Sequence, residues 1–166
     1  MTFAAALGGG VYVALLLWAM LSDLASFQIP NSVPVGLALG FVLAAALAGL
    51  PWDEAARHLG VALVVFVLGA VLHFTVTFGA GDVKLIAAVS LWFGWPLVLP
   101  LVLAIAVAGG FLALTLLLFR RISIPRGLLQ STWIGALHRR DGHIPYGVAI
   151  GLGALVLLPR ISWLQN

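Results

Sequence analysis

Two aspartates, Asp23 and Asp82, are the residues of this sequence whose type and position best suit them to chemistry. Asp23 follows an apolar run without charge, and Asp82 precedes an apolar run in which Lys84 is the one charge. A carboxylate at the edge of such a segment costs free energy unless it is paired, hydrated or used. Two carboxyl groups that share a site do not both ionise easily, so one holds a proton while the other acts as a base. Such a pair can hydrolyse a peptide bond.

The sequence around each aspartate bears on this interpretation. Asp82 stands in Phe78-Gly79-Ala80-Gly81-Asp82-Val83-Lys84, where the two glycines allow the backbone to approach the acid closely. Asp82 is also near the expected start of a helix, where negative charge is favoured. Asp23 precedes Ile29-Pro30-Asn31, and Pro30 is expected to end helical structure there. The alternative is two unrelated residues at helix boundaries, with their carboxylates in water.

The composition indicates that lipid is the solvent of this fold. Charged residues make up 8% of the 166 residues and apolar residues 63%, and the mean hydropathy is +1.20. Five acidic and eight basic side chains cannot cover a soluble globule, which excludes a soluble enzyme, a disordered protein and a nucleic-acid binder. Without cysteine, disulfides and thiolate metal sites are excluded. No cluster of histidines and acids suggests a metal, so we expect no cofactor.

The apolar runs predict an all-α, polytopic membrane protein. A membrane helix needs about 20 mostly apolar residues. The region 83–119 would be about 55 Å long as one helix, so we divide it at Gly94-Trp95-Pro96. The predicted spans are residues 2–22, 33–50, 59–77, 83–93, 97–119 and 144–159. We therefore expect six transmembrane helices in a single domain, residues 1–166, without a soluble domain.

The arginines predict how these helices are oriented. Five of them stand in the connection 120–143: Arg120, Arg121, Arg126, Arg139 and Arg140. The positive-inside rule places this connection in the cytoplasm, which puts both aspartates at the cytoplasmic face and both termini outside. Within this connection, residues 127–137 are either a short interfacial helix or a solvated loop.

Three landmarks, in order, resemble the type IV prepilin peptidases, which are membrane aspartyl proteases with a Gly-x-Gly-Asp motif. The first is Asp23 followed by Ile29-Pro30-Asn31. The second is Gly79-Ala80-Gly81-Asp82-Val83-Lys84, and the third is Pro145-Tyr146-Gly147-Val148-Ala149-Ile150. The resemblance extends over essentially the whole chain.

This resemblance implies cleavage of a short, positively charged leader from prepilins at the cytoplasmic face of a bacterial or archaeal membrane. Asp23 and Asp82 would be the catalytic pair. The residues that would support them are Gly79, Gly81, Lys84, Pro30, Asn31, Tyr146 and Gly147. The implied partners are a prepilin with its apolar N-terminal helix, membrane lipid and the pilus assembly machinery, but no nucleic acid.

The chain also departs from part of the family. Long members carry an extra N-terminal segment with two Cys-x-x-Cys pairs, which is associated with methylation of the new N-terminus. Here the first span begins close to Met1 and cysteine is absent. The chain is therefore similar to the short, peptidase-only form of tight-adherence (Flp) pilus systems. Many short members have basic residues between the first aspartate and Ile-Pro-Asn, whereas residues 24–28 here have none.

A different class of function remains as an alternative. Asp23, Asp82 and Lys84 could form the ion or proton path of a small transporter or channel. Transporters usually show internal repeats and charges at the membrane midplane, whereas both acids here are expected at one face. Lys84 could instead hold a substrate carboxylate, favour ionisation of an acid, or extend to the interface. For His73 we expect a packing or hydrogen-bonding role.

Overall fold

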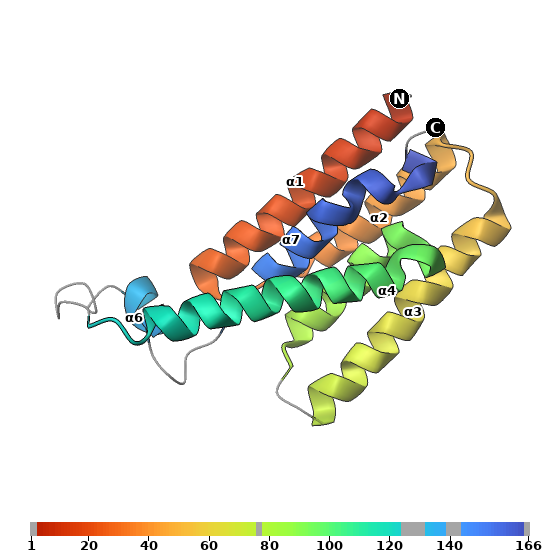
Figure 1. The fold of residues 1–166 in the computed structure, drawn as a ribbon. Coiled ribbons are helices and arrows are strands. Elements are labelled where there is room, and N and C mark those ends of the chain that lie inside the picture. Colours follow the sequence, from red (N-terminus) through yellow and green to blue (C-terminus); the bar gives the residue numbers. More distant parts are fainter. Residues whose placement is uncertain (1–2, 76–77, 124–131, 139–143, 165–166) are drawn as a thin grey trace.

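The computed structural model describes residues 3–75, 78–123, 132–138 and 144–164, and these are helical with short connections. The helices are α1 (Phe3–Ser26), α2 (Ser32–Leu47), α3 (Trp52–Thr75), α4 (Ala80–Phe119), α6 (Thr132–His138) and α7 (Tyr146–Leu157), followed by the short turns η1 (Leu158–Arg160) and η2 (Ser162–Leu164). The predicted all-α class is confirmed for these residues. Figure 1 shows the arrangement of the helices.

Among the residues that the structure describes, three helices are long and apolar enough to cross a membrane. They are Leu7–Ser26, Trp52–Thr75 and Ala80–Phe119, with mean hydropathies of 1.6, 2.1 and 2.7. Two shorter apolar helices, Ser32–Leu47 and Tyr146–Arg160, accompany them. Each predicted span overlaps one of these five helices, and the spans 83–93 and 97–119 both lie in Ala80–Phe119. Helix α1 continues to Ser26, so Asp23 lies in its last turn rather than beyond its end.

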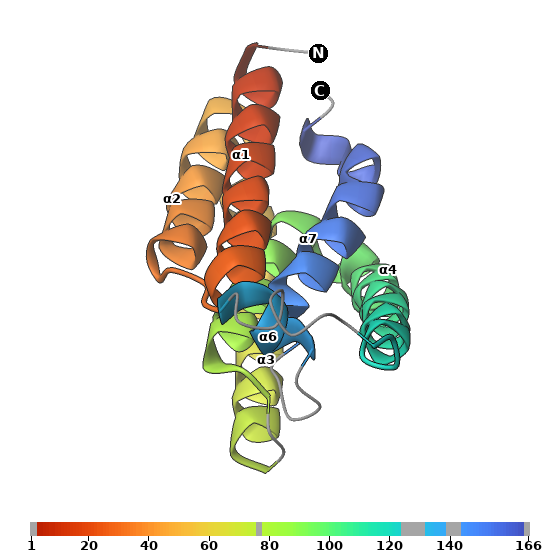
Figure 2. The same cartoon turned by 90° about the vertical axis from the view of Figure 1, so that its left-hand side faces the viewer.

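Helix α4 is broken at Gly94, within the predicted turn. Gly94 has φ 65° and ψ −174°, which side-chain-bearing residues rarely adopt, and helical geometry resumes at Trp95. The break is thus a single residue, shorter than the three-residue turn expected from the sequence. Figures 1 and 2 show that the two halves of α4 run in different directions on either side of it.

Two carbonyl groups of α4 lose their hydrogen-bond donors within the helix at this break, and side chains from other elements donate to them instead. Pro96 has no N–H for the Trp92 carbonyl, and Trp163 Nε1–H donates to that carbonyl at 3.1 Å. The Leu91 carbonyl accepts a hydrogen bond of 2.6 Å from Nδ1 of the buried His58. Buried backbone groups need such partners, above all in lipid, so α3 and η2 hold the bend of α4.

The core is centred on Trp92 of α4, which is fully buried. Its ring lies 4.8 Å from that of Tyr12, 6.0 Å from that of Phe41 and 5.7 Å from that of Trp163, measured between centroids. Its Nε1–H donates to the Leu37 carbonyl at 3.0 Å. Trp92 therefore joins α1, α2 and η2 to the first half of α4.

Helix α6 belongs to the arginine-rich connection. The helix Thr132–His138 confirms helical structure for the described part of the predicted segment 127–137. Arg126, Arg139 and Arg140 lie outside the described residues. Trp133 Nε1–H donates to the Leu24 carbonyl in the last turn of α1. Arg120 Nε–H donates to the Leu137 carbonyl at 2.9 Å. These bonds hold α6 against the ends of α1 and α4, away from the chain termini (Figure 1).

The break in α4 generates a prediction about stability. Gly94→Ala is expected to lower the free energy of unfolding by about 1–3 kcal/mol, because it forces a side chain into this conformation. The added Cβ would also lie 2.9 Å from the His58 ring. Thermal unfolding of the purified protein in detergent, followed by circular dichroism, measures the change.

Gly110→Ala is the matched control, because a Cβ there meets nothing within 4 Å and Gly110 lies in the same helix. This variant is expected to unfold at the same temperature as the unaltered protein or higher. Equal destabilisation by both substitutions would contradict a special role for the backbone at Gly94.

Candidate active site

Asp23 is held by the start of α7. Its side chain is only 5% exposed, and its Oδ2 accepts a hydrogen bond of 2.6 Å from the Gly147 N–H. Gly147 is the second residue of α7, where backbone N–H groups have no partner within the helix. A Cβ at this position would lie 2.8 Å from Asp23 Oδ2 and 3.0 Å from Ile29 Cδ1. A glycine is therefore required for α7 to approach this carboxylate so closely.

Asp82 stands in the first turn of α4, three residues after the extended Gly79. The Asp82 side chain is partly buried. A Cβ on Gly79 would lie 2.5 Å from Asp82 Oδ2, and one on Gly81 would lie 3.5 Å from Ile29 Cβ. The two glycines thus leave room for the carboxylate on one side and for the α1–α2 connection on the other.

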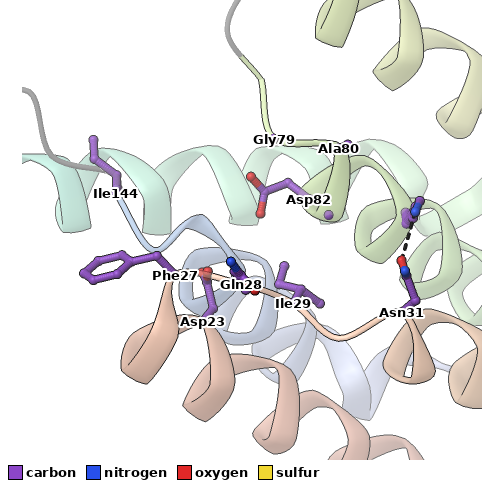
Figure 3. Close-up of a pocket in the computed structure, with 11 residues that line it drawn as sticks. Asp23, Phe27, Gln28, Ile29, Asn31, Gly79, Ala80, Asp82 and Ile144 are labelled. Atoms are coloured by element: carbon purple, nitrogen blue, oxygen red, sulfur yellow. Dashed lines mark hydrogen bonds between the residues drawn. The ribbon is translucent and has the colours of Figure 1, made fainter. Parts of the chain in front are cut away.

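The two aspartates line one cavity of about 360 Å³, although they are 59 residues apart in the sequence. Figure 3 shows the carboxylates of Asp23 and Asp82 extending into this cavity from opposite walls. The other lining residues are Phe27, Gln28, Ile29, Asn31, Gly79, Ala80, Gly81, Lys84 and Ile144. The cavity therefore brings two carboxyl groups together in a space that can hold water and part of a peptide.

Lys84 and Asn31 form one wall of this cavity. Lys84 Nζ donates a hydrogen bond of 2.8 Å to Asn31 Oδ1, which ties the start of α4 to the start of α2 (Figure 3). Pro30 directly precedes Asn31 and is partly buried in the same connection. Lys84 is two residues from Asp82 and so lies on another face of the helix.

The connection between α1 and α2 contributes residues that the sequence analysis did not single out. Phe27 has φ 55°, in the left-handed region, and its N–H donates to the Asp23 carbonyl at 2.8 Å. Gln28 follows, and its carbonyl accepts a hydrogen bond from Ser22 Oγ. Phe27 and Gln28 both line the aspartate cavity. No local signal pointed to them, because left-handed backbone is expected at Gly or Asn rather than Phe.

Tyr146 and His73 lie outside the lining of the aspartate cavity. The Tyr146 ring packs closely over Gly109 of α4, where an added Cβ would lie 2.7 Å from Tyr146 Cε2. The centroids of the Tyr146 and Phe78 rings are 5.8 Å apart. His73 Nδ1 is hydrogen-bonded to the Phe78 carbonyl. Within the described parts of the chain, no three His, Asp or Glu side chains are grouped to hold a metal ion.

Comparison of the sequence with known protein families gives one match. The sequence model of the type IV leader peptidase family matches residues 10–114, well over half of the chain. The match includes Asp23, Ile29-Pro30-Asn31 and the segment from Gly79 to Lys84. Searches of curated proteins and of solved structures find no significant match.

The contact between α7 and Asp23 generates a prediction about activity. Gly147→Ala is expected to lower the rate of leader-peptide cleavage at least about tenfold, because the added Cβ would lie 2.8 Å from Asp23 Oδ2 and force the N–H and the carboxylate apart. Loss of a hydrogen bond to a charged group costs about 1.5–3 kcal/mol. Cleavage of a leader-bearing substrate in detergent or proteoliposomes measures the effect. Gly10→Ala is the control, since a Cβ there meets nothing within 4 Å. Full activity of Gly147→Ala would show that this contact is dispensable.

Proposed function

The chain belongs to the type IV leader peptidase family, and on that premise we propose that it is an aspartic endopeptidase. Its substrates are prepilins, whose leader peptide it removes at the cytoplasmic face of the membrane. The observation that carries this proposal is the cavity shared by Asp23 and Asp82. The family match also favours a peptidase over the alternative of a small transporter.

The proposed reaction divides the roles of the two carboxyl groups. The Gly147 N–H stabilises negative charge on Asp23, so Asp23 is the base that takes a proton from water. The water oxygen then attacks the scissile carbonyl carbon, while the proton on Asp82 is donated to the carbonyl oxygen. The tetrahedral intermediate breaks down when the leaving amine receives the proton held by Asp23, and one of the two hydroxyl groups on the carbon returns its proton to Asp82. The C–N bond is cleaved, and water supplies the atoms added to the two products.

The remaining site residues have positioning roles in this proposal. Gly79 and Gly81 make room for Asp82, and Gly147 orients Asp23. Lys84 and Asn31 fix the cavity wall between α2 and α4, and Pro30 directs the chain into it. Tyr146 packs behind the start of α7, against α4.

We further propose six membrane spans, with α4 counted as two that meet at Gly94. The three long helices, the two shorter apolar helices and the break in α4 support this count. The arginines of the connection 120–143 and the contact of α6 with the end of α1 support a cytoplasmic location for the aspartate cavity. Both termini then face outward from the cytoplasmic membrane of a bacterium or archaeon.

The proposed partners follow from this activity and location. A prepilin would present its basic leader to the cytoplasm and its apolar N-terminal helix to the lipid. The proposed setting is a tight-adherence (Flp) pilus system, in which the protein works beside the pilus assembly machinery. No nucleic acid or cofactor takes part.

Substitution of either aspartate tests the proposal directly. Asp23→Asn and Asp82→Asn, each alone, are expected to lower prepilin cleavage at least about 100-fold, because each removes one partner of the acid–base pair. Membrane insertion is expected to be normal, as measured by the amount of protein in washed membranes.

Asp53→Asn is the matched control. The Asp53 side chain is 73% exposed, and its Oδ2 lies 3.6 Å from Arg57 Nη2. An exposed ion pair of this kind contributes little to the free energy of folding. This variant is expected to cleave normally. Normal cleavage by Asp23→Asn or by Asp82→Asn would contradict the aspartic mechanism.

The shared proton also predicts the pH dependence. The cleavage rate should follow a bell-shaped profile, because both carboxyls are protonated at low pH and no base remains. At high pH both are ionised and no acid remains. Initial rates across the pH range, with Asp53→Asn as the reference, measure the two limbs. A rate that is constant through the acid range, with chemistry rate-limiting, would count against the mechanism.

A further inference from the structure

A second cavity, of about 330 Å³, lies between α3 and the two halves of α4. Its wall is almost wholly apolar and includes Leu68, Leu72, Val83, Ile86, Val102 and Ala106. Leu68 and Leu72 are also exposed on the outer surface of α3. The cavity therefore opens on the side of the molecule where lipid is expected.

Small residues create this space. Gly69 of α3 faces α4, and a Cβ on it would lie 2.9 Å from Val83 Cγ1. Ala106 presents a single methyl group from the second half of α4. Larger side chains at these two positions would fill the cavity or push the helices apart.

Three residues that line the apolar cavity are next in the sequence to residues of the aspartate site. Phe78 directly precedes Gly79, and Val83 directly follows Asp82. Tyr146 directly precedes Gly147, whose N–H binds Asp23. The rings of Phe78 and Tyr146 are in edge-to-face contact at 5.8 Å. The wall of the apolar cavity thus begins one residue away from each side of the aspartate pair.

We propose that this cavity is a specificity subsite, which takes an apolar side chain of the substrate close to the scissile bond. The inference rests on the proposed peptidase function. An extended peptide advances about 3.3–3.6 Å per residue, so a residue next to a carbonyl held between the aspartates comes within reach of Phe78 and Tyr146. Because Leu68 and Leu72 line the cavity and are exposed on α3, the apolar part of a substrate would enter from the lipid side.

The first experiment fills the cavity. Ala106→Phe is compared with Val107→Phe, which adds the same ring at a position that is 62% exposed and belongs to the same helix outside the cavity lining. Two substrates are used: a prepilin with large apolar residues flanking the scissile bond, and the same prepilin with alanine in their place. Ala106→Phe should lower the rate on the first substrate at least about tenfold relative to the second, whereas Val107→Phe should leave that ratio unchanged.

The second experiment enlarges the cavity from the other helix. Leu72→Ala should shift the preference in the opposite direction, towards bulkier apolar residues beside the scissile bond. This change of ratio does not depend on how well Ala106→Phe folds. The decisive outcome is an unchanged ratio in both variants, with the rates on the two substrates either equally lowered or unaffected. That result overturns the proposal, whereas a shift of the ratio in Leu72→Ala supports it even where Ala106→Phe loses activity on both substrates.

The proposed function is tested separately by the same assay. Cleavage of both substrates by the unaltered protein without a change of ratio in the variants would refute the subsite and leave the peptidase intact. Absence of cleavage by the unaltered protein would instead contradict the peptidase itself.

Discussion

The hydrogen bond from the Gly147 N–H to Asp23 is the contact on which the arrangement of the site depends. It joins residues 124 positions apart, and each partner needs the other. The carboxylate is buried, and an amide at the start of a helix has no partner within that helix. Leaving either group unpaired would cost about 1–3 kcal/mol. The end of α1 and the start of α7 are therefore fixed together. Because α7 also packs against α4, which carries Asp82, the same contact helps to set the width of the aspartate cavity.

The helical class and the common cavity of Asp23 and Asp82 could be predicted because lipid leaves few ways for a chain to satisfy its backbone. Nearly uninterrupted apolar runs must become helices, and an acid between such runs is conspicuous. The break in α4 was also predictable, since Gly94 and Pro96 stand in a region too long for one span. Its exact form was not, because the single-residue bend is stabilised by His58 and Trp163, which are distant in the sequence.

The surroundings of the aspartates were harder to predict, for a physical reason. Phe27 adopts a left-handed conformation that its residue type disfavours, so only the packing of the whole chain explains it. The apolar cavity depends on the small size of the side chains at Gly69 and Ala106. Small residues in a membrane helix usually indicate only close helix packing, so the sequence did not point to a cavity. Tyr146 belongs to a recognisable motif, yet its ring packs against Gly109 rather than lining the aspartate cavity.

The bend at Gly94 has a consequence for how this sequence can change in evolution. His58 and Trp163 resemble parts of a functional site, since the histidine makes a buried and the tryptophan a partly buried hydrogen bond. Here each side chain donates to a carbonyl group of α4 that has lost its partner within the helix. This bend lies at the opposite end of the molecule from α6 (Figure 1). Relatives with an unbroken helix at this place would be free to lose both side chains together. Linked variation at positions 58, 94, 96 and 163 would then follow from the bend in α4 and would not by itself indicate a functional site.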